Sequence, residues 1–183
     1  GIICADLSLC HPDFRAGERT FQLLAQVSGR AGRGDVPGRV ILQTYNPEHF
    51  SIVSAVAQDF KAFFNQEITF RNVLKYPPFS RLIQLRISGK EKGKIRDFAR
   101  NMGDICEELQ KSDDSFLSAI QILGPIEAPV SKIAKRYRWQ ILLKGLNTGS
   151  LHRYIRRMMG TWPAAFHHAT IKVTVDVDPF FML

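Results

Sequence analysis

The chain has 183 residues, of which 45% are hydrophobic and 23% are charged, so its composition is globular and excludes a disordered protein. Its apolar runs fall far short of the roughly 20 residues that span a bilayer, and no secretion signal opens the chain, so we expect no membrane association. The net charge of +8 is uneven: residues 1–75 carry 8 Lys and Arg against 7 Asp and Glu, whereas residues 76–183 carry 17 against 10, which predicts a polyanionic partner for the second half.

Residues 1–75 alternate between predicted strands and predicted helices. The apolar run at residues 1–9 predicts a buried strand, and Asp13 is placed to cap the helix that follows. That helix is expected to end in the glycine cluster at residues 29–34, because glycine carries a high entropic cost in a helix. Residues 39–45 predict a second strand. One long amphipathic helix is then indicated by apolar residues at helical spacing: Val53, Val56, Phe60, Phe63 and Phe64. This rhythm indicates an α/β fold with a parallel sheet.

Tyr76, Pro77, Pro78 and Phe79 mark the predicted domain boundary, because two prolines prevent a helix from continuing. Beyond it, apolar residues alternate with polar ones in four stretches, and two further stretches show helical spacing. The strands centre on residues 83–87, 120–122, 139–143 and 171–177, and the helices on residues 95–109 and 151–162. The resulting order, βαββαβ, predicts an α+β ferredoxin-like domain whose two helices cover one face of the sheet.

The sequence Gln-Val-Ser-Gly-Arg-Ala-Gly-Arg-Gly at residues 26–34 is the strongest chemical motif. Arg30 and Arg33 lie at the predicted end of a helix, each preceded by a glycine (Gly29 and Gly32). A guanidinium matches phosphate oxygens with a planar fork of donors, and glycine lets the backbone approach a ligand without a Cβ in the way. The motif therefore predicts a phosphate contact. The alternative is an arginine-rich helix end, where the helix dipole favours cations.

The pattern Gln-x-x-Gly-Arg-x-Gly-Arg resembles the last conserved motif of superfamily two helicases. Blocks along the whole chain are similar to the PriA family of replication-restart helicases, also called primosomal protein N prime. These blocks are residues 13–24, 38–49, 76–79, 123–125, 136–143 and 175–179. The resemblance implies that residues 1–75 are the C-terminal part of the second RecA-like motor lobe. It implies that residues 76–183 are the C-terminal DNA-binding domain of the family.

The resemblance also implies roles for the motif residues. Arg33 is expected to be the arginine finger, Arg30 a second phosphate or nucleotide-sensing contact, and Gln26 a polar coupler at the lobe interface, with Gly29 and Gly32 allowing close approach of the nucleotide. ATP and Mg²⁺ would be held on the other lobe of the full-length protein. An arginine finger neutralises charge in the transition state and contributes on the order of 10³–10⁵ in rate in other nucleotide hydrolases.

The activity that the resemblance implies is ATP-dependent, 3′-to-5′ DNA unwinding for primosome assembly and restart of stalled forks. The implied partners are forked and single-stranded DNA, single-stranded-DNA-binding protein and primosome proteins, in the bacterial cytoplasm and associated with the nucleoid. The chain has no Gly-x-x-x-x-Gly-Lys-Ser/Thr loop, so we expect no ATPase activity from it alone. The zinc module that the family carries upstream is absent too, and zinc is expected only in the full-length protein.

Cysteine usage indicates a reduced protein without a metal site. Cys4, Cys10 and Cys106 form no Cys-x-x-Cys pair, and their spacing matches no zinc site. A cytosolic location is the simplest interpretation. The chain opens inside an apolar run and without an initiator Met, so we expect it to be a piece of a longer protein.

The predicted nucleic-acid contacts lie in the connection between the second and third strands of the second half: Lys132, Lys135, Arg136, Tyr137 and Arg138. Cations there can meet phosphates while an aromatic ring stacks on a base, at roughly 1–3 kcal/mol per base. The alternative is a solvated hairpin. Trp139 alternates in register with apolar residues and is predicted to lie in the core.

Two further surfaces each have two possible roles. The sheet face opposite the helices is expected to be polar and partly open, to contact DNA or the motor lobe, and to carry Gln84, Arg86, Arg138, Gln140, Lys172 and Thr174. The last helix has a basic face, either solvated or docking a partner, formed by His152, Arg153, Arg156 and Arg157. An alternative function for the chain is a stand-alone nucleic-acid-binding module of ferredoxin-like fold.

Overall fold

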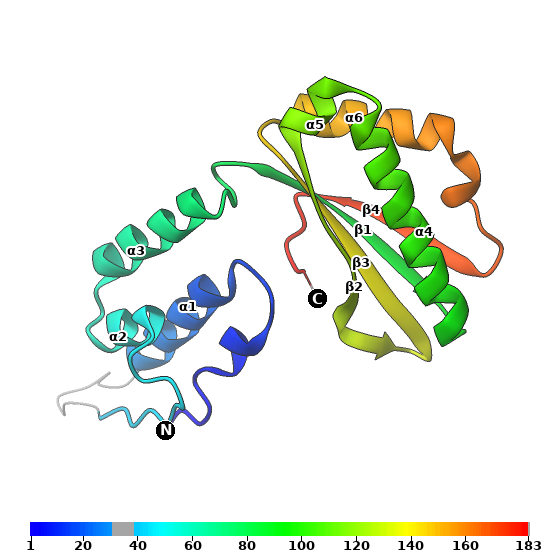
Figure 1. Ribbon diagram of the computed structural model, residues 1–183. Coiled ribbons are helices and arrows are strands. Elements are labelled where there is room, and N and C mark those ends of the chain that lie inside the picture. Colours follow the sequence, from blue (N-terminus) through cyan, green and yellow to red (C-terminus); the bar gives the residue numbers. More distant parts are fainter. Residues whose placement is uncertain (31–38, 183) are drawn as a thin grey trace. The chain divides into compact units, whose positions relative to one another are not determined.

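The computed structural model describes residues 1–30 and 39–182. By compactness the chain divides into two units, Gly1–Leu74 and Lys75–Leu183 (Figure 1). The first unit consists mainly of helices. The second is built around a four-stranded antiparallel sheet.

The first unit contains a short 3₁₀ helix, η1 (Leu7–Cys10), and three α-helices, α1 (Ala16–Ser28), α2 (Phe50–Val56) and α3 (Phe60–Val73). The strand predicted for residues 1–9 is wrong, because that segment turns into η1. The strand predicted for residues 39–45 shrinks to a single parallel bridge between Leu42 and Ile2. No other strand occurs among the described residues of this unit, so the parallel sheet of a RecA-like lobe is not confirmed.

The single long helix predicted after residue 50 is two helices. Gln58 adopts a left-handed conformation (φ 54°), which ends α2, and the Asp59 side chain accepts a hydrogen bond from the Ala62 backbone N–H at 2.9 Å, which begins α3. The break rotates the apolar residues away from a common face. Phe63 is buried, whereas Val56 is 67% exposed and Phe60 is 64% exposed.

A small apolar core holds the first unit together. It is formed by Ala5, Phe21, Leu24, Ile52, Ala55 and Phe63. The rings of Phe21 on α1 and Phe63 on α3 are stacked with their centroids 4.4 Å apart. Aromatic stacking therefore links these two helices at the centre of the unit.

The second unit consists of strands β1 (Arg81–Gly89), β2 (Ile120–Ile133), β3 (Arg136–Gly145) and β4 (Ile171–Val177), with helices α4 (Lys92–Lys111) and α6 (Thr148–Thr161) following β1 and β3. All neighbouring strands are antiparallel, in the order β2-β3-β1-β4. The predicted order βαββαβ is therefore present. Two short additions were not predicted, the helix α5 (Asp114–Ala119) and the 3₁₀ turn η2 (Pro163–Ala165).

The core of the second unit lies between the sheet and its helices. Ile83, Leu85 and Ile87 on β1 and Ile141 and Leu143 on β3 alternate toward α4 and α6, and all five are nearly inaccessible to solvent. Figure 1 shows α4, α5 and α6 on the same side of the sheet. The prediction that the helices cover one face is confirmed.

An irregularity in β2 brings this strand against α4. The pairing of β2 with β3 shifts between Leu123 and Ile126, and Gly124 there has φ +101°. A Cβ at Gly124 would lie 2.9 Å from the Gln140 carbonyl oxygen, so the position requires glycine. A Cβ at Gly103 of α4 would meet Pro125 at 2.7 Å, which shows how closely helix and strand approach.

The opposite face of the sheet is polar and partly open, as predicted. At its centre Gln84 and Gln140 are buried, 1% and 6% exposed, and the Gln84 side-chain amide donates to the Gln140 side-chain oxygen Oε1 at 2.7 Å. Arg86 forms an ion pair with Asp176 at 2.9 Å, and their side chains remain 39% and 30% exposed. The buried glutamine pair therefore closes only the centre of this face.

Candidate functional site

Helix α1 carries the described half of the phosphate-binding motif at its C-terminal end. Phe21 and Leu24 bury one side of the helix, and Gln26 lies on the exposed side. The helix ends as predicted at the first glycine of the cluster, because Gly29 is its C-cap residue and its N–H donates to the Ala25 carbonyl at 3.0 Å. Arg30 follows directly and is exposed.

Arg30 therefore presents its guanidinium at the surface of the first unit. Among the residues that the structure describes, no acidic side chain forms an ion pair with it. Gly32 and Arg33, the other predicted motif residues, lie outside the described residues. The structure thus places Gln26, Gly29 and Arg30 together at the end of one helix, and Arg33 stays a prediction.

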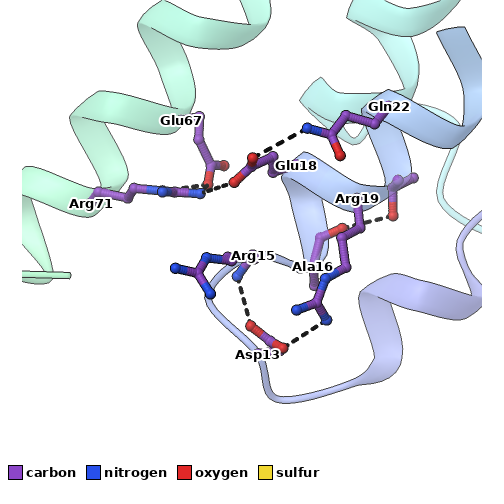
Figure 2. A network of polar contacts seen from close by, with 9 residues as sticks. Asp13, Arg15, Ala16, Glu18, Arg19, Gln22, Glu67 and Arg71 are labelled. Atoms are coloured by element: carbon purple, nitrogen blue, oxygen red, sulfur yellow. Dashed lines mark hydrogen bonds and ion pairs between the residues drawn. The ribbon is translucent and has the colours of Figure 1, made fainter. Parts of the chain in front are cut away.

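The opposite end of α1 is fixed by a polar network (Figure 2). Asp13 accepts a hydrogen bond from the Arg15 backbone N–H at 3.0 Å and forms an ion pair with Arg19 at 2.8 Å. The Asp13 carbonyl also accepts from the Ala16 N–H at 2.9 Å. Asp13 thus begins the helix from three positions upstream, although the N-cap residue itself is Arg15.

Arg71 links α1 to α3 in the same network. Its guanidinium lies 2.8 Å from a Glu18 carboxylate oxygen and 2.7 Å from one of Glu67, and the Phe14 ring stacks under it with its centroid 5.1 Å from Cζ. Burial lowers the pKa of Arg71, but the hydrogen bonds and charges of Glu18 and Glu67 outweigh it, and the net pKa is raised. We name this contact of Arg71 with Glu18 and Glu67 the Arg71 clasp.

No local sequence signal indicates the Arg71 clasp. Glu67 and Arg71 have the spacing of an ordinary surface pair on a helix, and Glu18 is 53 positions away from Arg71. Next to the clasp, α1 and α3 enclose a cavity of about 260 Å³. Its walls include the rings of Phe21, Phe60, Phe63 and Phe64.

The predicted nucleic-acid residues lie on a β-hairpin. The strands β2 and β3 pair as far as Lys132 with Tyr137 and Ile133 with Arg136, so only Ala134 and Lys135 form the turn. Both turn residues have positive φ, 48° and 61°, as in the tight turns that match the twist of a hairpin. The connection expected from the sequence is therefore shorter, and four of the five predicted residues belong to strands.

Tyr137 is covered, not open for stacking. It is half-buried and packs against the core of the unit, and Lys132 places its Nζ 4.8 Å from the centroid of the ring. Trp139 is also half-buried against that core, which confirms its prediction as a core residue. The aromatic side chains of this hairpin therefore stabilise the domain from within.

Arg136 is held in a fixed orientation by the end of β1. Its Nη2 donates to the Ser88 carbonyl at 2.7 Å, and its Nε donates to Ser88 Oγ at 3.3 Å. Arg138 lies directly beside Ser88 in the register of the two strands. Burial and the positive charge of Arg86 lower the pKa of Arg138. Burial is the larger of the two causes, and the repulsion from Arg86 adds to it.

The hairpin and its sheet belong to a known type of domain. The family described as Primosomal protein N C-terminal domain matches residues 72–180. The chain belongs to this family.

Similarity to longer relatives covers the first unit of the chain as well as the second. The chain is 37% identical over 179 residues to the Replication restart protein PriA of Synechocystis sp., 33% over 183 residues to that of Bacillus subtilis, and 38% over 183 residues to that of Treponema pallidum. These alignments cover 98 to 100% of the chain but only 20 to 26% of the relatives. The chain thus spans about a fifth to a quarter of their length.

The basic face of helix α6 is only partly solvated. Arg153 donates to Ser115 Oγ at 2.8 Å, and Arg157 forms an ion pair with Asp113 at 3.1 Å. These contacts join α6 to the start of α5, and they engage two of the four residues predicted for this face. Hydrogen bonding to Ser115 and the nearby arginines lowers the pKa of Asp113.

The described part of the chain has neither a metal-binding cluster nor a helix that could span a membrane. No group of three or more His, Cys, Asp or Glu side chains there is arranged to hold a metal ion. None of the helices there combines the length and the apolar character that crossing a bilayer requires.

Proposed function

We propose that this chain is the C-terminal portion of an ATP-dependent, 3′-to-5′ DNA helicase that supports primosome assembly and restart of stalled replication forks. Membership of the Primosomal protein N C-terminal domain family supports the proposal, as does similarity to Replication restart protein PriA along 98% or more of the chain in three relatives. Residues 1–75 would be the end of the second motor lobe, and residues 76–183 the DNA-binding domain.

The observation that carries the proposal is the exposed Arg30 directly after the Gly29 cap of α1. A guanidinium at a helix end with no acidic partner among the described residues fits the oxygens of a triphosphate. ATP bound on the rest of the longer protein would supply the phosphoryl group that is transferred to water. Arg30 and Arg33 would bring fixed positive charge to it, Gln26 would couple the lobes, and Gly29 and Gly32 would let the backbone approach. Magnesium and zinc would be held by the longer protein.

The second unit would bind forked and single-stranded DNA through the β2–β3 hairpin. Lys132 and Lys135 are exposed there, and Arg136 is oriented by Ser88. The covered ring of Tyr137 favours contact with phosphates over stacking on bases. Partners of the longer protein would include single-stranded-DNA-binding protein and primosome proteins, in the bacterial cytoplasm.

The test of the nucleotide role uses the longer PriA protein that contains this chain. We expect Arg33→Ala to lower kcat for DNA-dependent ATP hydrolysis by a factor on the order of 10³–10⁵, with unchanged affinity for DNA. Arg30→Ala is expected to lower kcat/KM as well. Arg39→Ala, an exposed arginine outside the motif, is the matched control and is expected to leave turnover unchanged. Unchanged turnover in both motif variants would refute the proposal.

A stand-alone nucleic-acid-binding module is the second candidate function. It is favoured by the core of the second unit, which that unit completes from its own residues. The two candidates differ in what Arg33→Ala does. In a binding module, the motif has no role in ATP hydrolysis, so Arg33→Ala is expected to leave ATP turnover unchanged. Substitutions in this chain would then change only the affinity for DNA.

A further inference from the structure

We infer that the DNA-binding surface of the second unit is a basic end of its sheet, built from four elements and made for the sugar-phosphate backbone, with Arg136 at its centre. This inference rests on the proposed function, which supplies DNA as the ligand. We define the basic end as Lys90, Lys92, Lys94, Lys132, Lys135, Arg136, Arg138 and Lys172. The sequence pattern had indicated the four hairpin residues, and Lys172 on the open sheet face, but not Lys90, Lys92 or Lys94.

Strand register brings these residues to one end of the sheet. Lys90 follows the last residue of β1, Gly89, which pairs with Tyr137 on one side and Ile171 on the other. Ser88 of β1 pairs with Arg138 of β3 on one side and with Lys172 of β4 on the other. Helix α4 begins at Lys92, two residues after Lys90. Figure 1 shows the start of α4 and the tip of the β2–β3 hairpin at this end.

The charge of the unit is concentrated here. Residues 75–183 carry eighteen Lys and Arg against ten Asp and Glu. The basic end holds eight of those cations and one acid, Glu91, which pairs with Lys94 at 2.9 Å. The rest of the unit holds ten cations against nine acids and is close to neutral. Surface charges of both signs are usually interspersed, so a one-signed end indicates a polyanion partner.

The start of α4 adds to the imbalance. Its first turn has no acidic residue but carries Lys92 and Lys94, and the Glu91 side chain makes no capping hydrogen bond. Cations are unfavourable at a helix N-terminus because the helix dipole is positive there. By contrast, Asp113 caps α5 and Asn147 caps α6 with their side chains. Glu91 compensates Lys94, but no acidic side chain among residues 75–182 pairs with Lys92. A local rule broken in this way is expected where a ligand supplies the missing charge.

Arg136 is the built part of the surface. Its two hydrogen bonds to Ser88 fix the guanidinium, and it lines two neighbouring cavities, of about 280 and 590 Å³. Lys90, Lys94 and Thr170 line the smaller cavity, and Lys172 lines the larger. Within residues 75–182, no acidic side chain pairs with Lys90, Arg136 or Lys172. A fixed fork flanked by lysines suits phosphate oxygens.

The chemistry favours backbone contact without base recognition. Tyr137, Trp139 and Phe98 near this end are half-buried against the core and offer no open ring for stacking. Recognition through phosphates alone is independent of base sequence and falls steeply with salt. The arginines of α6 are less suited to the same task, because Arg153 and Arg157 already contact Ser115 and Asp113.

The experiment is anisotropy of labelled single-stranded DNA with the 183-residue chain across a salt series. In the variant Lys90→Gln with Lys172→Gln, two phosphate contacts are lost. We expect the slope of log K against log salt to decrease in magnitude by about 1.4, and the affinity at 0.1 M salt to fall about 25-fold. The control is Arg81→Gln with Lys111→Gln, which removes the same charge from exposed residues at the other end of the sheet. It is expected to leave the slope unchanged.

The outcomes separate the inference from the proposed function. No DNA binding by the unmodified chain at low salt would refute both. Binding that is weakened by Lys132→Gln with Lys135→Gln, but not by the Lys90 and Lys172 substitutions, would leave the hairpin as the DNA site and overturn the basic end. Loss of polyglutamate binding with DNA binding intact in the Lys90 and Lys172 variant would assign this end to an acidic protein segment and overturn the inference too.

Discussion

The two units differ in how far each buries its own apolar residues. In the second unit, nineteen buried residues form one continuous core between the four-stranded sheet and its helices. Among the described residues of the first unit, six buried residues form the core, and large apolar side chains such as Leu23, Phe60, Phe64, Phe70 and Val73 are about half exposed or more. The second unit therefore buries most of its large apolar side chains by itself. The first is expected to bury its exposed apolar side chains against further protein.

The difference extends to what holds the helices in place. In the second unit, apolar packing fixes α4 and α6 on the sheet, and polar contacts such as that of Arg153 with Ser115 lie at the periphery. In the first unit, a polar contact, the Arg71 clasp, joins α1 to α3 beside the stacked rings of Phe21 and Phe63. Loss of an apolar side chain is therefore expected to destabilise the second unit most, whereas loss of a charged side chain of the clasp is expected to destabilise the first.

The largest expected effect comes from a matched pair of leucine substitutions. Leu85→Ala removes a fully buried side chain from the central strand β1 and is expected to lower the free energy of unfolding by about 2–5 kcal/mol. Leu23→Ala, at a position 50% exposed on α1, is expected to change it by less than about 0.5 kcal/mol. Urea unfolding followed by tryptophan fluorescence measures Leu85→Ala, because both tryptophans of the chain, Trp139 and Trp162, lie in the second unit, and far-UV circular dichroism measures Leu23→Ala.

Far-UV circular dichroism measures the helices of both units in the same titration. We expect its transition to begin at lower urea than the fluorescence transition, because the first unit has the smaller core. Coincident transitions in the unmodified chain, or equal losses from Leu85→Ala and Leu23→Ala, would show that the two units unfold as one and would remove the contrast drawn above.

Sequence pattern was sufficient to locate the strands of the second unit because apolar and polar residues alternate in β1, β3 and β4 and in the first part of β2. Ile83, Leu85 and Ile87 point to the core and their neighbours do not, so period alone located β1 and the other strands. The alternation of apolar and polar residues did not predict how far the β2–β3 hairpin extends. Residues 128–133 alternate poorly, and the register with β3 is shifted between Glu127 and Lys132. The pattern therefore predicts Lys132 in a connection, although it belongs to β2.

The same approach failed in the first unit because apolar runs there lack partners among the described residues. Ile2 and Leu42 form one bridge, and the apolar residue Ile3 is 77% exposed. A run of apolar residues becomes a strand only where neighbouring strands accept its hydrogen bonds. The helix break at Gln58 had a local signal in Asp59, a good N-cap residue, which the spacing of the phenylalanines outweighed.

The candidate site was predictable to the extent that its chemistry is local. Gln26, Gly29 and Arg30 lie within five consecutive residues of one motif, and α1 ends at the first glycine of the predicted cluster. The Arg71 clasp and the basic end depend on residues far apart in the sequence, such as Lys90 and Lys172. Strand alternation placed Lys172 on the same sheet face as Arg138, but only the fold brings Lys90 and the start of α4 beside them.

A smaller effect is expected from the Arg71 clasp. Arg71→Ala leaves Glu67 and Glu18, with side chains 12% and 35% exposed, without their cation. We expect this change to destabilise the first unit by about 1–2 kcal/mol, less than for a fully buried pair because water reaches Glu18. The early circular dichroism transition is expected to move to lower urea while the fluorescence transition stays in place.

Two variants sharpen this test. Lys61→Ala, an exposed position on the same helix α3, removes a charge outside the clasp and is expected to have no effect. The double variant Glu18→Arg with Arg71→Glu places one cation between Glu67 and the new glutamate, and is expected to restore most of the lost stability. If the double variant is no more stable than Arg71→Ala, attraction between α1 and α3 is not what the clasp contributes.

The smallest effect is a pH dependence confined to the second unit. Burial raises the pKa of the Cys106 thiol to about 12 from an ordinary 9.0, whereas Cys4 and Cys10 in the first unit are exposed. The folded state holds the thiol proton more tightly, so this stabilisation is complete below pH 9 and is lost as pH rises toward 12. Between pH 8 and 10 the fluorescence-detected free energy of unfolding is expected to fall by about 1 kcal/mol more than in Cys106→Ala.

Thiol labelling compares the two units directly. At pH 8 a thiol reagent is expected to modify Cys4 and Cys10 rapidly and Cys106 only as fast as the second unit opens, because the thiolate is the reactive form and Cys106 is fully buried. The Tyr154 hydroxyl donates to the Cys106 carbonyl and holds α6 against α4 over this thiol. Tyr154→Phe is therefore expected to speed labelling of Cys106 without changing that of Cys4 or Cys10. Equal labelling rates at all three cysteines in the folded chain would mean that the second unit opens as readily as the first, which its larger core is expected to prevent.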